Sequence, residues 1–199
     1  MISSTPARRA TFEVAVKDVL GGESSPVQIN VDVASIPASE TLVITTGSTN
    51  AAESIIRYDV DAGTFKSSVP APAEARGLVP MPDGTVFVTT GDRGEGDSGE
   101  LVQDMSSTVG KVIRVSRDGS VPQDNPFVGR DGDDLIWSLG HRNAQGAAIG
   151  PDGALWTVEH GPRGGDELNR PEAGVNYGWP VITYGVNYVL GTRIGEGTQ

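Results

Sequence analysis

The sequence predicts an all-β fold and, within that class, a β-propeller built of antiparallel blades. Glycine (27) and proline (13) are spread through the 199 residues, which is typical of many short strands joined by tight turns. A Pro-Asp-Gly turn leads into a run of β-branched and aromatic residues at two places, and a second type of strand also recurs. Such a repeat cannot bury both faces of its sheet alone, and packing several copies around an axis solves this problem.

One element of the repeat is a turn followed directly by a strand. It occupies residues 82–90, residues 151–158 and, in a weaker copy without Pro-Asp-Gly, residues 39–47. Asp-Gly supplies the positive φ that tight turns require, so we expect each copy to be the second strand of a hairpin. In the other strand type, apolar and polar residues alternate, and the strand ends in a turn of acidic residues and glycine. It occurs at residues 55–63 and 111–119. The repeating unit is therefore strand, turn, strand, loop, strand.

The length of the chain bounds the number of blades. A blade takes about 40 to 50 residues and a closed ring needs at least about four blades, so the chain accommodates about three to four. Either the chain is a small propeller, or it is part of a larger one. We expect residues 1–199 to form a single propeller domain with an incomplete ring. A β-sandwich is the alternative fold, and it predicts no blade-like recurrence.

A long polar insertion, residues 91–110, separates two of the predicted strands. Long loops on a rigid β scaffold commonly carry function. Composition by itself, however, favours a disordered surface loop. A further strand is expected after the insertion and the following loop, at residues 136–139.

The charge and the residue types exclude several classes of partner. With 15 basic and 26 acidic residues the net charge is −11, which opposes attraction to phosphate backbones and anionic membranes. We therefore expect no nucleic-acid partner. Cysteine is absent, so a metal would be held by oxygen or imidazole ligands. Residues 1–20 hold no apolar run long enough for a signal peptide or a membrane span, so we expect neither in this chain.

Both histidines of the chain, His141 and His160, lie in one stretch rich in glycine and charged residues, Gly140–Asn169. Three segments, in their order and spacing, resemble the soluble PQQ-dependent sugar dehydrogenases, the glucose/sorbosone dehydrogenase family: Gly140–Gly146, Glu159–Asn169 and Asn176–Pro180. The resemblance continues upstream in Gly91-Asp92, Gly110–Arg114, Asp118-Gly119 and Asp124–Phe127. It covers about residues 78–184, whereas residues 1–70 match only as a blade-like pattern.

This resemblance implies a fold, a cofactor and a reaction. The family has a six-bladed propeller, in a chain considerably longer than this one, with the quinone PQQ over the axial face and Ca²⁺ beside it. Its members oxidise the hydroxyl at the anomeric carbon of an aldose. A histidine base takes the hydroxyl proton while hydride passes to the quinone, and an acceptor later reoxidises the cofactor. The implied partners are a small sugar and an electron acceptor, and the implied location is periplasmic or secreted.

Four residues are candidates for binding PQQ. A planar guanidinium suits the carboxylates of this cofactor, and Arg142 fits that role, although an isolated arginine is more often part of a surface ion pair. Asn143 and Gln145 alternate along the chain, so an extended backbone would place both amides on one face. His160 directly precedes a glycine-rich turn and is expected to contact cofactor or metal.

Three residues are candidates for binding calcium. The turn at Gly161-Pro162 offers backbone carbonyls and Asp166 adds a carboxylate, which are the oxygen ligands that calcium prefers. In the family the equivalent carbonyls and a nearby aspartate hold the ion. A plain β-turn with solvated charges is the alternative. We expect His141 to have an orienting or packing role, and the aromatic residues of 176–180 to pack at a blade edge.

The catalytic base of the family is not present at its expected position. The resemblance assigns Asp92 as the carboxylate that orients the base histidine. Counting back from Pro82, the position of that histidine falls at about Ala73, so this chain has no histidine there. Loss of a general base typically removes a factor of about 10² to 10⁴ in rate. Glu74, one residue away, could substitute if burial raised its pKa. The activity of this chain is therefore open.

Two other functions remain alternatives to the dehydrogenase. One is a non-catalytic propeller that keeps the calcium turn and binds a sugar or a protein, which the alanine at the base position favours. The other is a calcium-dependent lactonase-type propeller, which performs metal-assisted hydrolysis and needs carboxylates from several blades to converge on the axis.

Overall fold

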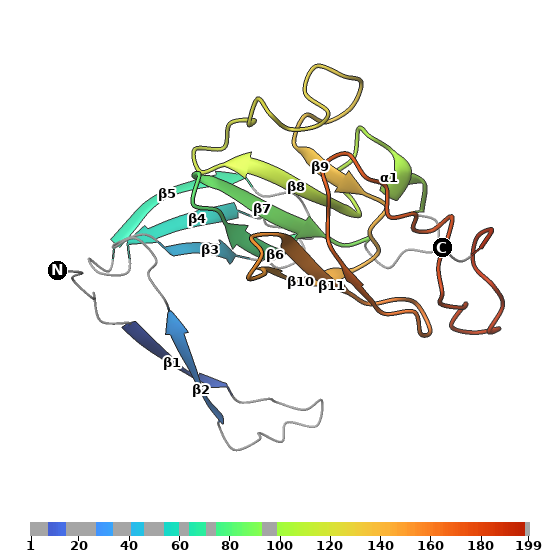
Figure 1. The fold of residues 1–199 in the computed structure, drawn as a ribbon, viewed down its shortest axis with the longest axis horizontal. Coiled ribbons are helices and arrows are strands. Elements are labelled where there is room, and N and C mark those ends of the chain that lie inside the picture. Colours follow the sequence, from blue (N-terminus) through green and yellow to red (C-terminus); the bar gives the residue numbers. More distant parts are fainter. Residues whose placement is uncertain are drawn as a thin grey trace. The chain divides into compact units, whose positions relative to one another are not determined.

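A computed structural model describes residues 8–14, 27–33, 41–45, 54–59, 64–70, 75–92 and 99–197 (Figure 1). Strands that follow one another in sequence are neighbours in four separate sheets. The sheets are β1–β2 (Arg8–Val14, Val27–Val33), β3–β4–β5 (Thr41–Thr45, Ser54–Asp59, Thr64–Pro70), β6–β7–β8–β9 (Ala75–Pro80, Thr85–Thr90, Lys111–Ser116, Ile136–Leu139) and β10–β11–β12 (Ala144–Ile149, Leu155–Glu159, Glu167–Asn169). Small sheets of this kind are the blades of a propeller, so the predicted fold class is confirmed.

The contacts within the chain divide it into two compact units, residues 1–41 with 58–65, and residues 42–57 with 66–199. In the first unit β1 and β2 pair in an antiparallel ladder from Arg8↔Val33 to Val14↔Val27. The second unit contains the sheets β6–β9 and β10–β12, which carry every candidate site residue that the structure describes.

The predicted strands are present. β7 and β11 follow the two Pro-Asp-Gly turns, β3 follows the weaker copy, β4 and β8 are the alternating strands, and β9 is the strand expected at residues 136–139. Gly84 and Gly153 have φ angles of 87° and 78°, which glycine adopts without strain. In the first turn Asp83 Oδ1 accepts hydrogen bonds from the backbone N and Oγ1 of Thr85, at 2.8 and 2.7 Å. The turn thus fixes where β7 begins.

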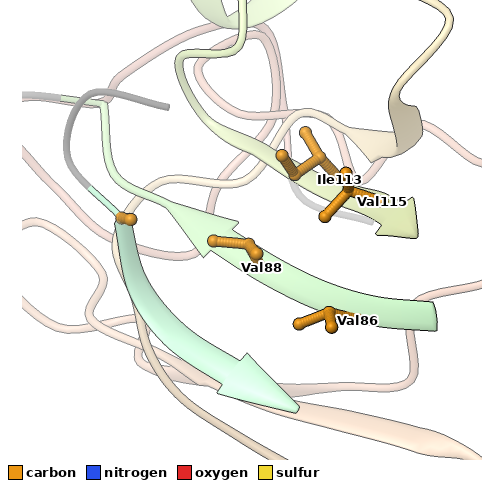
Figure 2. Packing of buried hydrophobic residues seen from close by; sticks show 5 residues of the cluster. Val86, Val88, Ile113 and Val115 are labelled. Atoms are coloured by element: carbon orange, nitrogen blue, oxygen red, sulfur yellow. The ribbon is translucent and has the colours of Figure 1, made fainter. Parts of the chain in front are cut away.

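The sheet β6–β9 is buried on both faces, and all six residues of β7 are buried. On one face Val86 and Val88 lie opposite Val115 and Ile113 of β8, and these four side chains form one cluster (Figure 2). Val69 of β5 packs against this cluster. Val69 therefore covers part of this face of the sheet.

The other face of the same sheet is closed by the following blade. Phe87 and Val112 form a second buried cluster with Leu155 of β11. The ring of Trp137 meets that of Phe87 edge to face, with centroids 5.1 Å apart, a favoured aromatic geometry. Burial on both sides explains why β7 consists of β-branched and aromatic residues and does not alternate between buried and exposed positions.

A polar contact joins the two blades at the end of β7 near the candidate site. Thr89 Oγ1 accepts a hydrogen bond from Gly77 N and donates one to Ala144 O of β10, both at 2.8 Å. The blades approach closely here, because a Cβ on Gly77 would lie 2.9 Å from Thr89 Oγ1 and 3.1 Å from Ala147 Cβ. A single hydroxyl therefore satisfies two buried backbone groups on different blades.

In the insertion between β7 and β8, the structure describes residues 91–92 and 99–110, and residues 99–103 form helix α1 (Gly99–Gln103). The disordered loop favoured by composition is wrong for this part, because Val102 and Val109 are buried. Lys111 is also fully buried, and its Nζ donates to the carbonyls of Leu101, Val102 and Val109 at 3.0, 2.7 and 2.8 Å. Burial lowers the pKa of this ammonium to about 8. No helix in the described residues is long and apolar enough to cross a membrane.

Replacing Thr89 with valine tests the contact between the blades. Thr89→Val keeps the side-chain volume but leaves Gly77 N and Ala144 O without their shared partner, so we expect a loss of about 1–3 kcal/mol in the free energy of unfolding. Urea denaturation followed by circular dichroism measures it, with the exposed Thr192→Val as the matched control. A loss no larger than that of the control would contradict this role.

Candidate cofactor-binding site

The candidate site is built by three chain segments that meet at one end of the two blades. Gly91, which follows β7, forms an isolated antiparallel bridge with Asn143. Asp92 N donates to Arg142 O at 2.6 Å, and His160 N donates to Asn143 O at 3.1 Å. Backbone hydrogen bonds therefore lock the chain after β7, the chain before β10 and the chain after β11 together.

Arg142 lies at the centre of the site. Its Nη1 donates to the carbonyls of His160 and Gly161, both at 2.7 Å, and its Nη2 donates to Tyr188 Oη at 3.3 Å. Its guanidinium lies over the ring of Trp179, 5.2 Å from the centroid, within cation–π range. The side chain is 14% exposed. The structure therefore places Arg142 directly on the glycine-rich turn that follows β11.

Asp92 faces Arg142, but the two side chains are not hydrogen-bonded. Arg142 Nε lies 3.9 Å from Asp92 Oδ2, and it is a buried donor without a hydrogen-bond acceptor in the described part of the chain. Asp92 Oδ2 instead accepts the indole N–H of Trp179 at 3.1 Å. The predicted role of Asp92 in orienting a base concerns position 73, which lies outside the described residues together with Glu74.

A buried polar network lies directly behind Arg142. His141 is fully buried, and its Nδ1 and Nε2 lie 2.6 Å from Glu159 Oε1 and 2.8 Å from Ser138 Oγ. Its ring stacks on that of Tyr177 at 4.8 Å. Glu159 also accepts hydrogen bonds from Asn169 Nδ2 at 2.9 Å and from the backbone N of Arg142 at 3.1 Å. His141 thus packs and orients as predicted.

The Glu159 carboxylate is stabilised in its charged form. Burial acts to raise the pKa of Glu159, but the charge of His141 and the hydrogen bonds from His141, Asn169 and Arg142 N outweigh it, so the pKa lies below its ordinary value. Because one oxygen of this carboxylate binds the Arg142 backbone, the buried pair fixes the segment from which the guanidinium extends.

The two predicted amides lie beside Arg142 and share a face. Gln145 Nε2 donates to Asn143 Oδ1 at 2.5 Å, so the alternation along the extended chain brings both side chains together, as predicted. Gln145 is exposed and Asn143 is half-buried. Amide donors and acceptors are therefore available at the mouth of the site.

The predicted calcium turn folds back on itself. Gly161 N donates to Asp166 Oδ1 at 2.9 Å, and a Cβ on Gly161 would lie 2.2 Å from Gly164 O and 2.4 Å from Gly165 O. Several backbone oxygens and one carboxylate thus gather around the turn. Gly161 O already accepts from Arg142, which leaves its second lone pair for another partner. The donor set is oxygen alone, as a hard cation requires.

Histidine and acidic side chains of the turn point to solvent. His160 and Asp166 have side chains 64% and 69% exposed, with 3.8 Å between His160 Nδ1 and Asp166 Oδ2. The described residues bring no three His, Cys, Asp or Glu side chains together in a way that could hold a metal.

A small pocket opens between the Arg142 segment, the turn and the segment after Asn176. It is lined by Arg142, Glu159, His160, Gly161, Gly165, Glu167, Tyr177, Trp179, Ile182 and Thr183. Its enclosed part has room for about one water molecule, so a ligand with several rings would lie across its mouth.

Sequence reasoning missed several residues of the site. Tyr177 and Trp179 follow Asn176, which bridges Leu139 of the edge strand β9, so the segment lies at a blade edge as expected. Their additional contacts with His141 and Arg142 were not predicted. Glu159 stands in the motif without a predicted role. The sequence offered one signal for Glu159, which is an acidic residue at the end of a strand where the chain is buried. Tyr188 lies 46 residues from Arg142 in sequence, and nothing local marks it.

The fold and the site together define a β-propeller with a guanidinium, two amides and an oxygen-lined turn at one end of its blades, a combination suited to a planar anionic cofactor. The chain belongs to the glucose/sorbosone dehydrogenase family, whose model matches residues 38–199.

Individual relatives have names that agree with the family. The chain is 50% identical over 105 residues to the aldose sugar dehydrogenase YliI of Escherichia coli K12, covering 52% of this chain and 28% of that protein. It is 39% identical over 122 residues to the quinoprotein glucose dehydrogenase B of Acinetobacter calcoaceticus, covering 53% of this chain and 25% of that protein. The chain therefore spans about a quarter of the length of these two curated relatives.

The three-dimensional comparison covers more of the chain. The crystal structure of the soluble aldose sugar dehydrogenase (Asd) from Escherichia coli in its apo-form matches with a TM-score of 0.65 and 28% identity. The match covers 93% of this chain and 62% of that one.

Replacing Glu159 with glutamine tests the buried network. In Glu159→Gln an amide NH₂ replaces one carboxylate oxygen, so either His141 or the Arg142 backbone loses its acceptor, and the charge opposite His141 is removed. We expect the free energy of unfolding to fall by about 3 kcal/mol. Chemical denaturation measures it against the exposed Glu172→Gln, for which a change within about 0.5 kcal/mol is expected. Equal effects in the two variants would refute the role of Glu159.

Proposed function

We propose that this protein is a PQQ-dependent oxidoreductase that oxidises the anomeric hydroxyl of an aldose, and that the Arg142 site binds PQQ. The observation that carries the proposal is the near-buried guanidinium of Arg142, whose Nε has no acceptor among the described residues. A buried donor of this kind is costly unless a partner satisfies it. The names of the relatives, an aldose sugar dehydrogenase and a quinoprotein, support a sugar substrate and a quinone.

Each residue of the site has its own proposed role in binding. Arg142 supplies positive charge and planar donors for a carboxylate. Asn143 and Gln145 present amides beside it, in mutual contact, for cofactor or substrate oxygens. His160 is exposed at the rim, with its backbone tied to Asn143 and Arg142, which suits contact with the bound cofactor or metal.

When bound, PQQ would supply the acceptor for the hydride of the substrate, which carries the two electrons of the oxidation. The protein must provide a base for the hydroxyl proton, and position 73 holds alanine. Asp92 would act beside that position as an orienting carboxylate. We propose slow turnover, lowered by about 10² to 10⁴ relative to a site with a positioned base, unless Glu74 serves as the base.

Arg142→Gln tests the cofactor site. With PQQ and Ca²⁺ present, we expect the wild-type protein to perturb the quinone absorbance at micromolar cofactor and to support slow aldose-dependent dye reduction. Arg142→Gln removes the charge and is expected to weaken PQQ binding at least about tenfold. The exposed Arg130→Gln serves as the control. Absence of PQQ binding by the wild-type protein would defeat the proposal.

We further propose that the carbonyls of Gly161 and Pro162 and the carboxylate of Asp166 bind Ca²⁺. Oxygen donors gather at this turn, and Arg142 connects it to the cofactor site through Gly161 O. One carboxylate makes a weak calcium site by itself, so the carboxylates of a bound cofactor are expected to add to it. Binding of the two would then be mutually favourable.

Asp166→Asn tests the calcium site. The amide oxygen can still accept from Gly161 N, so the turn is kept while the charge is removed, and we expect the Kd for Ca²⁺ to rise about tenfold. Titration calorimetry with Ca²⁺ measures this, with the exposed Asp131→Asn as control. In the wild-type protein, PQQ and Ca²⁺ should tighten each other's binding by the same factor. Unchanged calcium affinity in Asp166→Asn would exclude this residue as a ligand.

A non-catalytic, calcium-binding propeller that recognises a sugar or a protein is the second candidate, favoured by the alanine at position 73. It predicts Ca²⁺ binding without PQQ binding and without dye reduction, so the same titrations separate the two functions. For the dehydrogenase we propose a periplasmic or secreted location and a separate electron acceptor.

A further inference from the structure

Trp179 holds a position that neither the mechanism nor the motif explains. Its ring covers the Arg142 guanidinium at 5.2 Å, and its indole N–H donates to Asp92 Oδ2 at 3.1 Å. This oxygen is also the one nearest to Arg142 Nε, at 3.9 Å. Trp179 therefore contacts both partners of the Asp92–Arg142 ion pair, the carboxylate through its indole N–H and the guanidinium through its ring.

The backbone of Trp179 is held by the insertion between β7 and β8. Gln103, the last residue of α1, donates from Nε2 to Trp179 O at 2.6 Å. The same side chain accepts from Asn176 Nδ2 at 2.6 Å. On the other side of Trp179, Pro180 packs so closely on Gly99 that a Cβ there would lie 2.6 Å from Pro180 Cγ. Both ends of α1 thus contact the segment that carries the indole.

The helix is in turn fixed to the blade. The buried ammonium of Lys111, at the start of β8, binds the carbonyls of Leu101 and Val102 in α1 and that of Val109. Thr90 Oγ1, at the end of β7, donates to Thr108 O. A five-residue helix would not be stable alone, and these contacts give it one position relative to the sheet.

We propose that residues 99–111 form a clamp that positions the Trp179 indole over Arg142, and that Gln103 is the positioning residue of this clamp. Releasing Trp179 would take the ring away from the guanidinium and the indole N–H away from Asp92 Oδ2, and so alter the groups that Arg142 and Asp92 present to an anionic ligand. The effect on Trp179 is independent of the proposed function, whereas the effect on PQQ binding rests on it.

Two substitutions of Gln103 test the clamp. Gln103→Leu removes all three hydrogen bonds of the side chain at similar volume. Gln103→Glu keeps the acceptor for Asn176 Nδ2 while removing the donor to Trp179 O and to Asn176 Oδ1. Gln123→Leu, on an exposed loop where Gln123 bonds Val121 O, is the matched control. The first measurement is the solvent exchange rate of the Trp179 indole N–H by NMR in the unliganded protein, with the indole of Trp137 as internal reference.

We expect Trp179 exchange to become about tenfold faster in Gln103→Leu and in Gln103→Glu, with Trp137 and the control variant unchanged. If Gln103→Leu does not fold, Gln103→Glu carries the test alone. Trp179 exchange within about twofold of wild type in folded Gln103→Glu would overturn the proposal.

The second measurement is the Kd for PQQ in the presence of Ca²⁺, at a temperature where every variant is fully folded. We expect it to rise about tenfold in both Gln103 variants and to stay unchanged in Gln123→Leu. Faster indole exchange in a protein whose wild type binds no PQQ would support the clamp and reject the proposed function. Faster exchange with unchanged PQQ affinity would overturn the positioning role of Gln103.

Discussion

The candidate site depends on one buried carboxylate. Glu159 binds the imidazole of His141 at 2.6 Å with one oxygen and the backbone N of Arg142 at 3.1 Å with the other. A buried ionised group is tolerated only where such partners offset its desolvation. The end of β11 and the segment that precedes β10 are thereby held at a fixed distance, and the guanidinium extends from that fixed backbone.

Arg142 then joins two parts of the site that the sequence presents separately. By binding the carbonyls of His160 and Gly161, it orders the backbone of the turn for which calcium is proposed. The same side chain faces Asp92 and Trp179. A group in contact with both regions couples them physically, because a change in its charge balance on one side alters what it offers on the other.

Much of the local structure could be predicted from the sequence. The Pro-Asp-Gly turns and the alternating strands predicted β7, β8 and β11, and the spacing of Asn143 and Gln145 predicted that their amides share a face. The role of the insertion could not be predicted in this way. Because its composition is polar, nothing indicated that two of its valines and the neighbouring Lys111 are buried. The partners of Lys111 are backbone carbonyls, which every sequence has and which therefore give no signal.

The sequence by itself determined the fold class and the hairpin turns, because positive φ at glycine and apolar alternation act over a few residues. The resemblance to the family indicated the neighbourhood of the site. The tertiary structure alone decided which polar groups pair: Glu159 with His141 across 18 positions, Gln103 with Trp179 across 76 and Trp179 with Asp92 across 87. These pairings depend on how blades and loops pack, and local preferences carry no information about contacts between distant segments.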